Sequence, residues 1–232
     1  MRNKPQLILI PHAGGSCYSF SAIEPFLGDF NIVPLELPGR GKRIREKLIT
    51  DFEMAAYDLY RQILDRLNGA EFLVYGHSLG SYLALRITNM LEKNNLSPLY
   101  LLVSGNPGPG MRTDKRRYLL EQEDFIKEIR QLGGIEDEFF ENKELLEFYL
   151  PILRADFELA EVNDMAAAHP VNIPIYAMMG NQEDEVGNIE NWSRFTRSFF
   201  DYKILEGDHF FINKVPRQTA SVIISCYDRV TF

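Results

Sequence analysis

Short apolar runs alternate with longer amphipathic stretches along most of the chain. Each run is brief, rich in Val, Ile, Leu or Tyr, and ends near Gly, Pro or a polar residue, as buried strands do. Between them, apolar positions recur three and four residues apart, which is the helical period. The alternation predicts an α/β fold with a mostly parallel central sheet flanked by helices. The predicted strands are Gln6–Ile10, Asn31–Leu35, Glu71–Tyr75, Leu99–Ser104, Ile173–Met179 and Tyr202–Leu205, and the predicted helices Phe52–Leu67, Leu79–Glu92 and Arg217–Asp228.

One region, residues 107–168, interrupts this alternation. It contains no convincing strand, and helical patterns near Glu121–Leu132 and Lys143–Val162 dominate it. The segment is longer than an ordinary crossover connection. We interpret it as a helical lid inserted into a single domain of residues 1–232, with an elaborate crossover helix as the alternative.

Composition narrows the class of protein. The 232 residues suit one α/β domain, and the formal charge of −8 argues against a nucleic-acid partner. The first apolar run is too short for a signal peptide, and no stretch is long enough to span a membrane. Two scattered cysteines, Cys17 and Cys226, favour a reducing compartment. We therefore expect a cytoplasmic protein.

The sequence GHSLG at residues 76–80 follows a predicted strand and opens a predicted helix. In this context the pattern G-x-S-x-G predicts a tight turn that exposes a nucleophilic serine, here Ser78. The Leu79 N–H, at the start of the helix, is a candidate oxyanion donor. The alternative is a serine that merely caps a helix.

A serine hydroxyl needs a base within hydrogen-bond reach. Of the four histidines, His209 is our candidate because it follows the last predicted strand. The base in turn needs a carboxylate after the penultimate strand, where NQEDE stands at residues 181–185. We expect Asp184 to be this acid, with Glu183 as the main rival.

Small residues follow the first strand in the sequence PHAGG at residues 11–15. A backbone amide near Ala13 could complete an oxyanion hole with that of Leu79. A phosphate-binding loop is the alternative, although the full dinucleotide fingerprint is missing.

Four motifs together are more specific than any one of them. In order, PHAGG (11–15), LPGRG (37–41), YGHSLG (75–80) and GDHFF (207–211) resemble the type II thioesterases of nonribosomal peptide and polyketide synthases. The resemblance covers nearly the whole chain and implies the α/β-hydrolase fold with a lid. It matches Ser78, Asp184 and His209 to the catalytic triad and Ala13 and Leu79 to the oxyanion amides. One departure concerns the acid turn: the family usually has Asp-Pro there, whereas Glu185 follows Asp184 here.

The activity that the resemblance implies is hydrolysis of acyl or aminoacyl thioesters on the phosphopantetheine arm of carrier proteins, which restores a stalled synthase. No cofactor or metal is implied, nor a nucleic-acid or membrane partner, and we expect a monomer. A medium-chain acyl thioesterase or a carboxylesterase would use the same triad. A binding protein on a hydrolase scaffold is the remaining alternative.

Two further patterns bear on substrate delivery. A basic stretch follows the LPGRG turn and is either a solvated loop or a docking surface for acidic carrier proteins. Apolar side chains of the insertion either line an acyl pocket or pack the lid on the core. The basic residues are Arg40, Lys42, Arg43, Arg45 and Lys47, and the apolar ones Phe139, Phe140, Phe148, Tyr149, Leu150, Ile152 and Leu153.

Overall fold

The computed structural model describes residues 4–111, 115–134 and 137–231. Residues 112–114 and 135–136 of the expected insertion lie outside the described residues. Residues 1–3, which precede the first apolar run, also lie outside the described residues.

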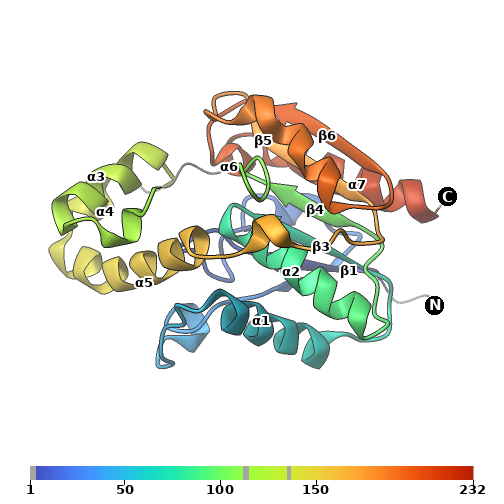
Figure 1. Ribbon diagram of the computed structural model, residues 1–232, viewed down its shortest axis with the longest axis horizontal. Coiled ribbons are helices and arrows are strands. Elements are labelled where there is room, and N and C mark those ends of the chain that lie inside the picture. Colours follow the sequence, from blue (N-terminus) through green and yellow to red (C-terminus); the bar gives the residue numbers. More distant parts are fainter. Residues whose placement is uncertain (1–3, 112–114, 135–136, 232) are drawn as a thin grey trace.

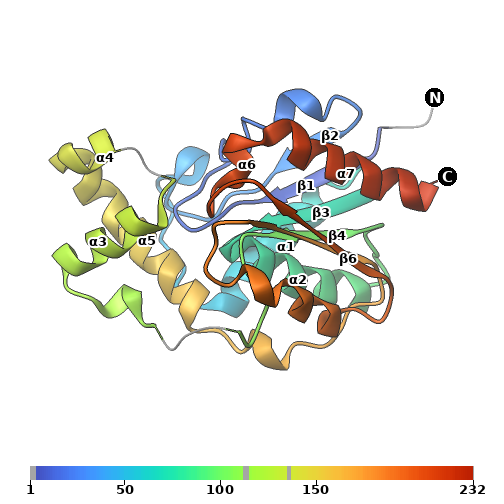
Figure 2. The ribbon, with the colours of Figure 1, turned by 90° about the horizontal axis from the view of Figure 1, so that it is seen from above.

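A six-stranded sheet in the order β2-β1-β3-β4-β5-β6 forms the centre of the molecule (Figures 1 and 2). Every pairing between its strands is parallel. The prediction of a mostly parallel sheet is therefore confirmed, with strand ends shifted by no more than two residues. The strands are β1 (Gln6–Ile10), β2 (Asn31–Pro34), β3 (Phe72–His77), β4 (Leu101–Ser104), β5 (Ile175–Gly180) and β6 (Phe200–Leu205).

Helices cover both faces of the sheet (Figure 2). One face packs against α1 (Phe52–Arg66) and α2 (Leu79–Lys93), and the other against α7 (Pro216–Thr231). Because successive strand residues point to opposite faces, a strand between two helical layers must be apolar on both sides. This explains the continuous apolar runs of β1, β3 and β4, which are buried along their whole length.

In its described residues, the segment between β4 and β5 contains three α-helices that project beyond the sheet (Figures 1 and 2). They are α3 (Gln122–Leu132), α4 (Asp137–Glu141) and α5 (Lys143–Glu161). Helix α4 was not predicted, because five residues are too few to show a helical period. The helices share a small apolar cluster of their own.

Helix α5 differs along its length. Its first half is mostly exposed, whereas from Leu150 onward most residues are buried, and Leu159 belongs to the main core. Pro151 lies at the boundary between the two halves. The insertion is thus anchored to the core through the second half of α5.

Short elements complete the described chain. They are 3-10 helices η1 (Glu24–Phe26), η2 (Gly41–Arg43), η3 (Arg117–Leu119), η4 (Met165–Ala167) and η5 (Val186–Phe195), and helix α6 (Phe211–Lys214). Cys17 and Cys226 are both buried and free. Within the described ranges, no helix has the length and apolar content needed to cross a membrane.

Candidate active site

Ser78 stands at the sharp turn between β3 and α2. Its φ of 56° lies in the left-handed region that residues other than glycine rarely adopt. The flanking glycines make this turn possible. A Cβ on Gly76 would collide with the Gly80 carbonyl, and a Cβ on Gly80 with the Ile10 carbonyl of β1. Strand and helix therefore pack closely, and Ser78 is held at the carboxyl end of the sheet.

Three side chains form a hydrogen-bonded relay at this end of the sheet. Ser78 Oγ lies 3.0 Å from His209 Nε2, and His209 Nδ1 lies 2.9 Å from Glu183 Oε2. With its proton on Nδ1, the imidazole donates to the carboxylate and accepts from the serine hydroxyl. This is the geometry in which a histidine can take the serine proton while its charged form is stabilised by the acid.

The structure corrects the expected position of the acid. Glu183, and not Asp184, contacts His209; Asp184 lies exposed at the rim of the site. The second oxygen of Glu183 accepts the backbone N–H of Gly180 at 2.8 Å, which turns the side chain back over the end of β5.

Two further histidines surround His209. The His77 ring is fully buried with its centroid 5.2 Å from that of His209, and His12 lies edge-on to His77. Burial lowers the pKa of His12 to about 4 and the pKa of His77 well below its ordinary value. Both rings are therefore neutral near pH 7, and neither repels the imidazolium that His209 forms when it accepts a proton.

Buried polar side chains form hydrogen bonds around the turn that carries Ser78. Ser104 Oγ contacts His77 Nδ1 at 2.8 Å, and Ser81 Oγ bridges the carbonyls of Gly76 and Ser104. Asn106 donates to the carbonyl of Ser78 at 2.7 Å. The sequence did not single out Ser81, Ser104 or Asn106. For Ser104 and Asn106 the available signal was their position at and just after the end of β4, and for Ser81 its position in the first turn of α2.

The two expected oxyanion donors lie beside the serine. Ala13 and Leu79 border one pocket together with Ser78 and His209. Leu79 is the first residue of α2, so its N–H has no acceptor within the helix. The backbone after Ala13 is fixed by Gly14, whose N–H donates to Asp156 Oδ2 of α5 at 2.6 Å.

Two pockets meet at Ser78 and His209. One has a volume of about 460 Å³ and lies between the glycine-rich loop after β1 and the insertion, bordered there by Phe139, Tyr149 and Leu153. Phe140 and Leu150, by contrast, are buried inside the insertion, and Phe148 is 45% exposed. The apolar residues of the insertion thus divide between pocket lining and internal packing.

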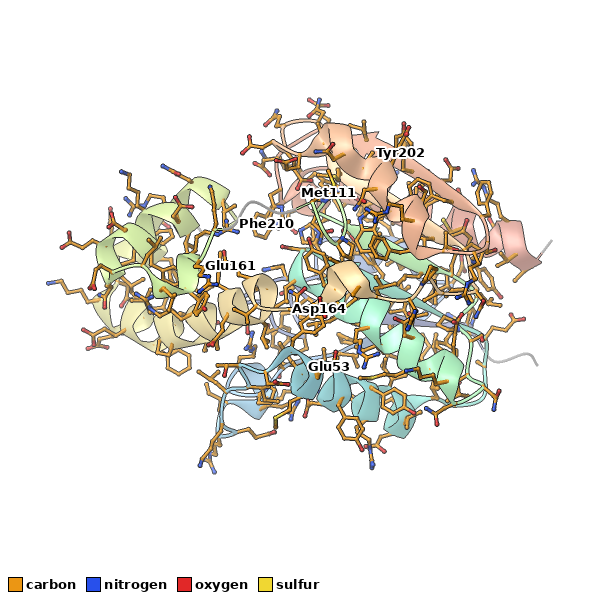
Figure 3. All side chains as sticks on the ribbon, viewed as in Figure 1. Glu53, Met111, Glu161, Asp164, Tyr202 and Phe210 are labelled. Atoms are coloured by element: carbon orange, nitrogen blue, oxygen red, sulfur yellow. The ribbon has the colours of Figure 1, made fainter. Side chains whose placement is uncertain are left out.

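The second pocket, of about 350 Å³, lies toward β5 and the start of the insertion and is more polar. Met111, Arg117 and Glu161 border it, and Arg117 forms an ion pair with Glu161 at 2.6 Å. In Figure 3 the labelled Phe210, a wall residue of the first pocket, and Glu161 lie where the insertion meets the rest of the molecule. In the described part of the chain, no group of three or more His, Cys, Asp or Glu side chains is arranged to hold a metal ion.

The basic stretch is less uniform than its sequence indicates. Arg40 is buried and paired with Asp156, and Arg43 is engaged by Asp58 and Glu46. The side chains that stay exposed are those of Lys42, Arg45 and Lys47. The docking hypothesis therefore concerns these three residues.

A parallel sheet covered on both faces, with a serine–histidine–acid relay at its carboxyl edge, defines a serine hydrolase of the α/β-hydrolase class. Within this class, a family model described as "Thioesterase domain" matches residues 5–228. The chain belongs to the thioesterase family and is a thioester hydrolase.

Individual relatives agree with this family. The chain is 30% identical to the gramicidin S biosynthesis protein GrsT of Aneurinibacillus migulanus over 214 residues, covering 90% of this chain and 83% of the relative. It is 29% identical to the medium-chain S-acyl fatty acid synthase thioesterase of Rattus norvegicus over 219 residues, covering 90% and 82%.

A solved structure resembles the fold throughout. YbtT, a type II thioesterase from the yersiniabactin NRPS/PKS biosynthetic pathway, superposes with a TM-score of 0.89 at 25% identity, covering 99% of this chain and 95% of that one. The resemblance to type II thioesterases inferred from the four sequence motifs is thereby confirmed.

Proposed function

We propose that the protein hydrolyses acyl or aminoacyl thioesters on the phosphopantetheine arm of carrier proteins, as an editing enzyme of a nonribosomal peptide or polyketide synthase. The observation on which this rests is the relay Ser78–His209–Glu183 at the meeting point of two pockets. The named relatives in such pathways support the substrate class.

In the proposed mechanism, Ser78 is the nucleophile. His209 accepts the serine proton as Oγ attacks the thioester carbonyl, and Glu183 stabilises the resulting imidazolium. The N–H groups of Ala13 and Leu79 bind the oxyanion. The thiol leaves with the proton from His209, and a water molecule activated by the same imidazole then hydrolyses the acyl-enzyme.

The two pockets suggest how the substrate lies. The apolar pocket beside Tyr149 and Leu153 suits an acyl group, and the more polar one beside Arg117 and Glu161 suits the amide-containing arm. The insertion forms walls of both, so we propose that it acts as the lid. With this assignment, the side chains of the insertion that line the apolar pocket determine which acyl groups are preferred.

We place the carrier protein on Lys42, Arg45 and Lys47. Glu36 accepts the backbone N–H groups of Cys17 and Lys42 at 2.9 and 2.8 Å, so the basic segment lies beside the loop that borders the apolar pocket. Exposed cations near a site entrance attract an acidic partner. The carrier protein as partner, a monomeric state and a location in the cytoplasm are all predictions.

A substrate comparison tests the proposal. Wild-type protein should hydrolyse acyl-carrier thioesters with a higher kcat/KM than the matching acyl-CoA or oxygen ester, and Ser78→Ala should abolish turnover while the fold is retained. The variant Lys42→Glu/Arg45→Glu should lower kcat/KM several-fold for the carrier-bound substrate and leave that for a small thioester unchanged. Glu24→Lys, at η1 away from the site, is a charge-change control.

Other outcomes would point elsewhere. Faster turnover of medium-chain acyl-CoA or of acyl groups on a fatty-acid carrier would favour the second candidate, a medium-chain thioesterase, for which the rat relative is the specific observation. Faster turnover of oxygen esters would favour a carboxylesterase. No labelling of Ser78 by a fluorophosphonate would indicate a binding protein on the same scaffold.

A further inference from the structure

Asp156 of helix α5 is a buried carboxylate that the proposed reaction does not use directly. Its side chain is 0% exposed, and it is an acid among otherwise apolar buried positions of that helix. Buried carboxylates are costly unless they are paired and hydrogen-bonded. The partners of Asp156 therefore indicate its role.

One partner of Asp156 is the guanidinium of Arg40, in the loop that follows β2. Arg40 contacts both carboxylate oxygens and is itself only 3% exposed. A two-pronged arginine–carboxylate contact fixes the orientation of the carboxylate as well as neutralising it. The pair joins the insertion to the body of the molecule.

The other partner is the backbone N–H of Gly14, which donates to Asp156 Oδ2 at 2.6 Å. The carbonyl of the same peptide unit, that of Ala13, lies 2.9 Å from His12 Nδ1. The Ala13–Gly14 peptide is therefore held at both ends, by a ring on one side and by helix α5 on the other. This peptide adjoins, across the Cα of Ala13, the His12–Ala13 peptide, which carries the N–H that we assign to the oxyanion hole.

Close packing supports the same contact. Gly14 has a φ of +73°, and a Cβ there would lie 2.5 Å from the side chain of Leu153, one turn before Asp156 on α5. Ala13 itself packs against both the main core and the cluster of the insertion. The second half of α5 thus rests directly on the loop that carries the Ala13 amide.

We propose that Asp156 is a positioning residue for catalysis: from the insertion, it holds the Ala13–Gly14 peptide and thereby the adjoining His12–Ala13 peptide, whose Ala13 N–H faces the oxyanion. The proposal rests on the proposed function. It explains how the insertion can affect the rate of the chemical step as well as substrate binding. Because the acceptor belongs to α5, displacement of this helix would weaken the oxyanion hole.

The experiment separates the hydrogen bond from the buried charge pair. Asp156 variants are made in an Arg40→Met background, so that no unpaired cation remains. Arg40→Met/Asp156→Asn retains a side-chain oxygen that can accept the Gly14 N–H, whereas Arg40→Met/Asp156→Leu retains the volume without an acceptor. We expect kcat on a small acyl thioester to be at least tenfold lower for the Leu variant than for the Asn variant, with KM values within threefold. Removal of a whole oxyanion donor lowers kcat by about 10²–10³-fold, which bounds the effect from above.

Binding of an oxyanion-forming inhibitor gives an independent readout. An alkyl trifluoromethyl ketone, whose adduct with Ser78 bears the oxyanion, should bind the Leu variant more weakly by the same factor. Equal kcat for the two double variants, or a change confined to KM, would overturn the proposal. If wild-type protein hydrolyses the small thioester but shows no preference for a carrier-bound substrate, the proposed function is wrong. The comparison of the two double variants on the small thioester still decides the role of Asp156 in that case.

A measurement on the wild-type protein covers the case in which a variant does not fold. With glycine labelled by ¹⁵N, the Gly14 amide should exchange with deuterium far more slowly than that of exposed Gly28. Similar exchange rates for the two glycines would show that the Asp156 contact does not persist and would overturn the proposal.

Discussion

Glu183 reaches His209 because of the way in which β5 ends. Gly180 is the last residue of the strand, and the Glu183 N–H donates back to the Gly180 carbonyl at 3.2 Å while the Glu183 side chain accepts the Gly180 N–H. This local pairing points one carboxylate oxygen toward the imidazole. A carboxylate so placed stabilises the imidazolium and holds the ring in the tautomer that accepts the serine proton.

Substitution of the two neighbouring acids should separate their roles. Glu183→Gln keeps the shape but removes the charge, so we expect kcat to fall by about 10⁴-fold, the scale seen when a triad acid is neutralised. Asp184→Asn, the matched control, should change kcat by less than threefold. Steady-state kinetics on a small thioester measures both, and a larger loss for Asp184→Asn would return the acid to that residue.

At the scale of elements, the turn between β3 and α2 depends on the contact of α2 with β1. Gly80, in the first turn of α2, lies against the Ile10 carbonyl at the end of β1. The N-terminus of α2 is thereby directed at the carboxyl edge of the sheet, where its free N–H groups and positive dipole end favour a developing negative charge. The absence of a side chain at Gly80 therefore serves two purposes. It lets α2 pack closely on β1, and it directs the N-terminus of α2 at the site of the proposed chemistry.

A methyl group at this contact should be costly. Gly80→Ala should lower the free energy of unfolding by about 1–3 kcal/mol, the usual cost of forcing an extra group into a packed interior. Gly187→Ala is the control, because no atom lies within 4 Å of the added Cβ there. Urea denaturation followed by circular dichroism measures both; equal stabilities would mean that α2 moves away from β1 without cost.

For the whole molecule, two histidines beside the site, the partly buried His12 and the buried His77, link stability to pH. His12 has a folded-state pKa of about 4 and the pKa of His77 is also lowered, whereas in the unfolded chain both should titrate near 6.5. Between these values the unfolded state binds more protons than the folded state. The free energy of unfolding is therefore highest above about pH 6.5 and decreases as the pH falls toward 4.

Urea midpoints measured from pH 7.5 to pH 5.5 test this linkage, above the range in which carboxylates titrate. We expect the free energy of unfolding to fall as the pH is lowered, by at most about 1.4 kcal/mol per pH unit for each histidine. His12→Gln should reduce the slope, although it also lowers stability at pH 7.5. His169→Gln, at an exposed position, is the control for replacing a histidine by glutamine. A wild-type midpoint independent of pH in this range would contradict the assignment.

The sequence by itself determined the parallel sheet, the turn at Ser78 and the choice of His209. Each depends on a local pattern: apolar runs buried on both faces, glycines where side chains do not fit, and a histidine just after the last strand. The tertiary structure alone decided between Glu183 and Asp184, because adjacent residues differ in direction and not in chemistry. It alone paired Arg40 with Asp156, 116 residues apart, since a long-range contact leaves no periodic trace in the chain.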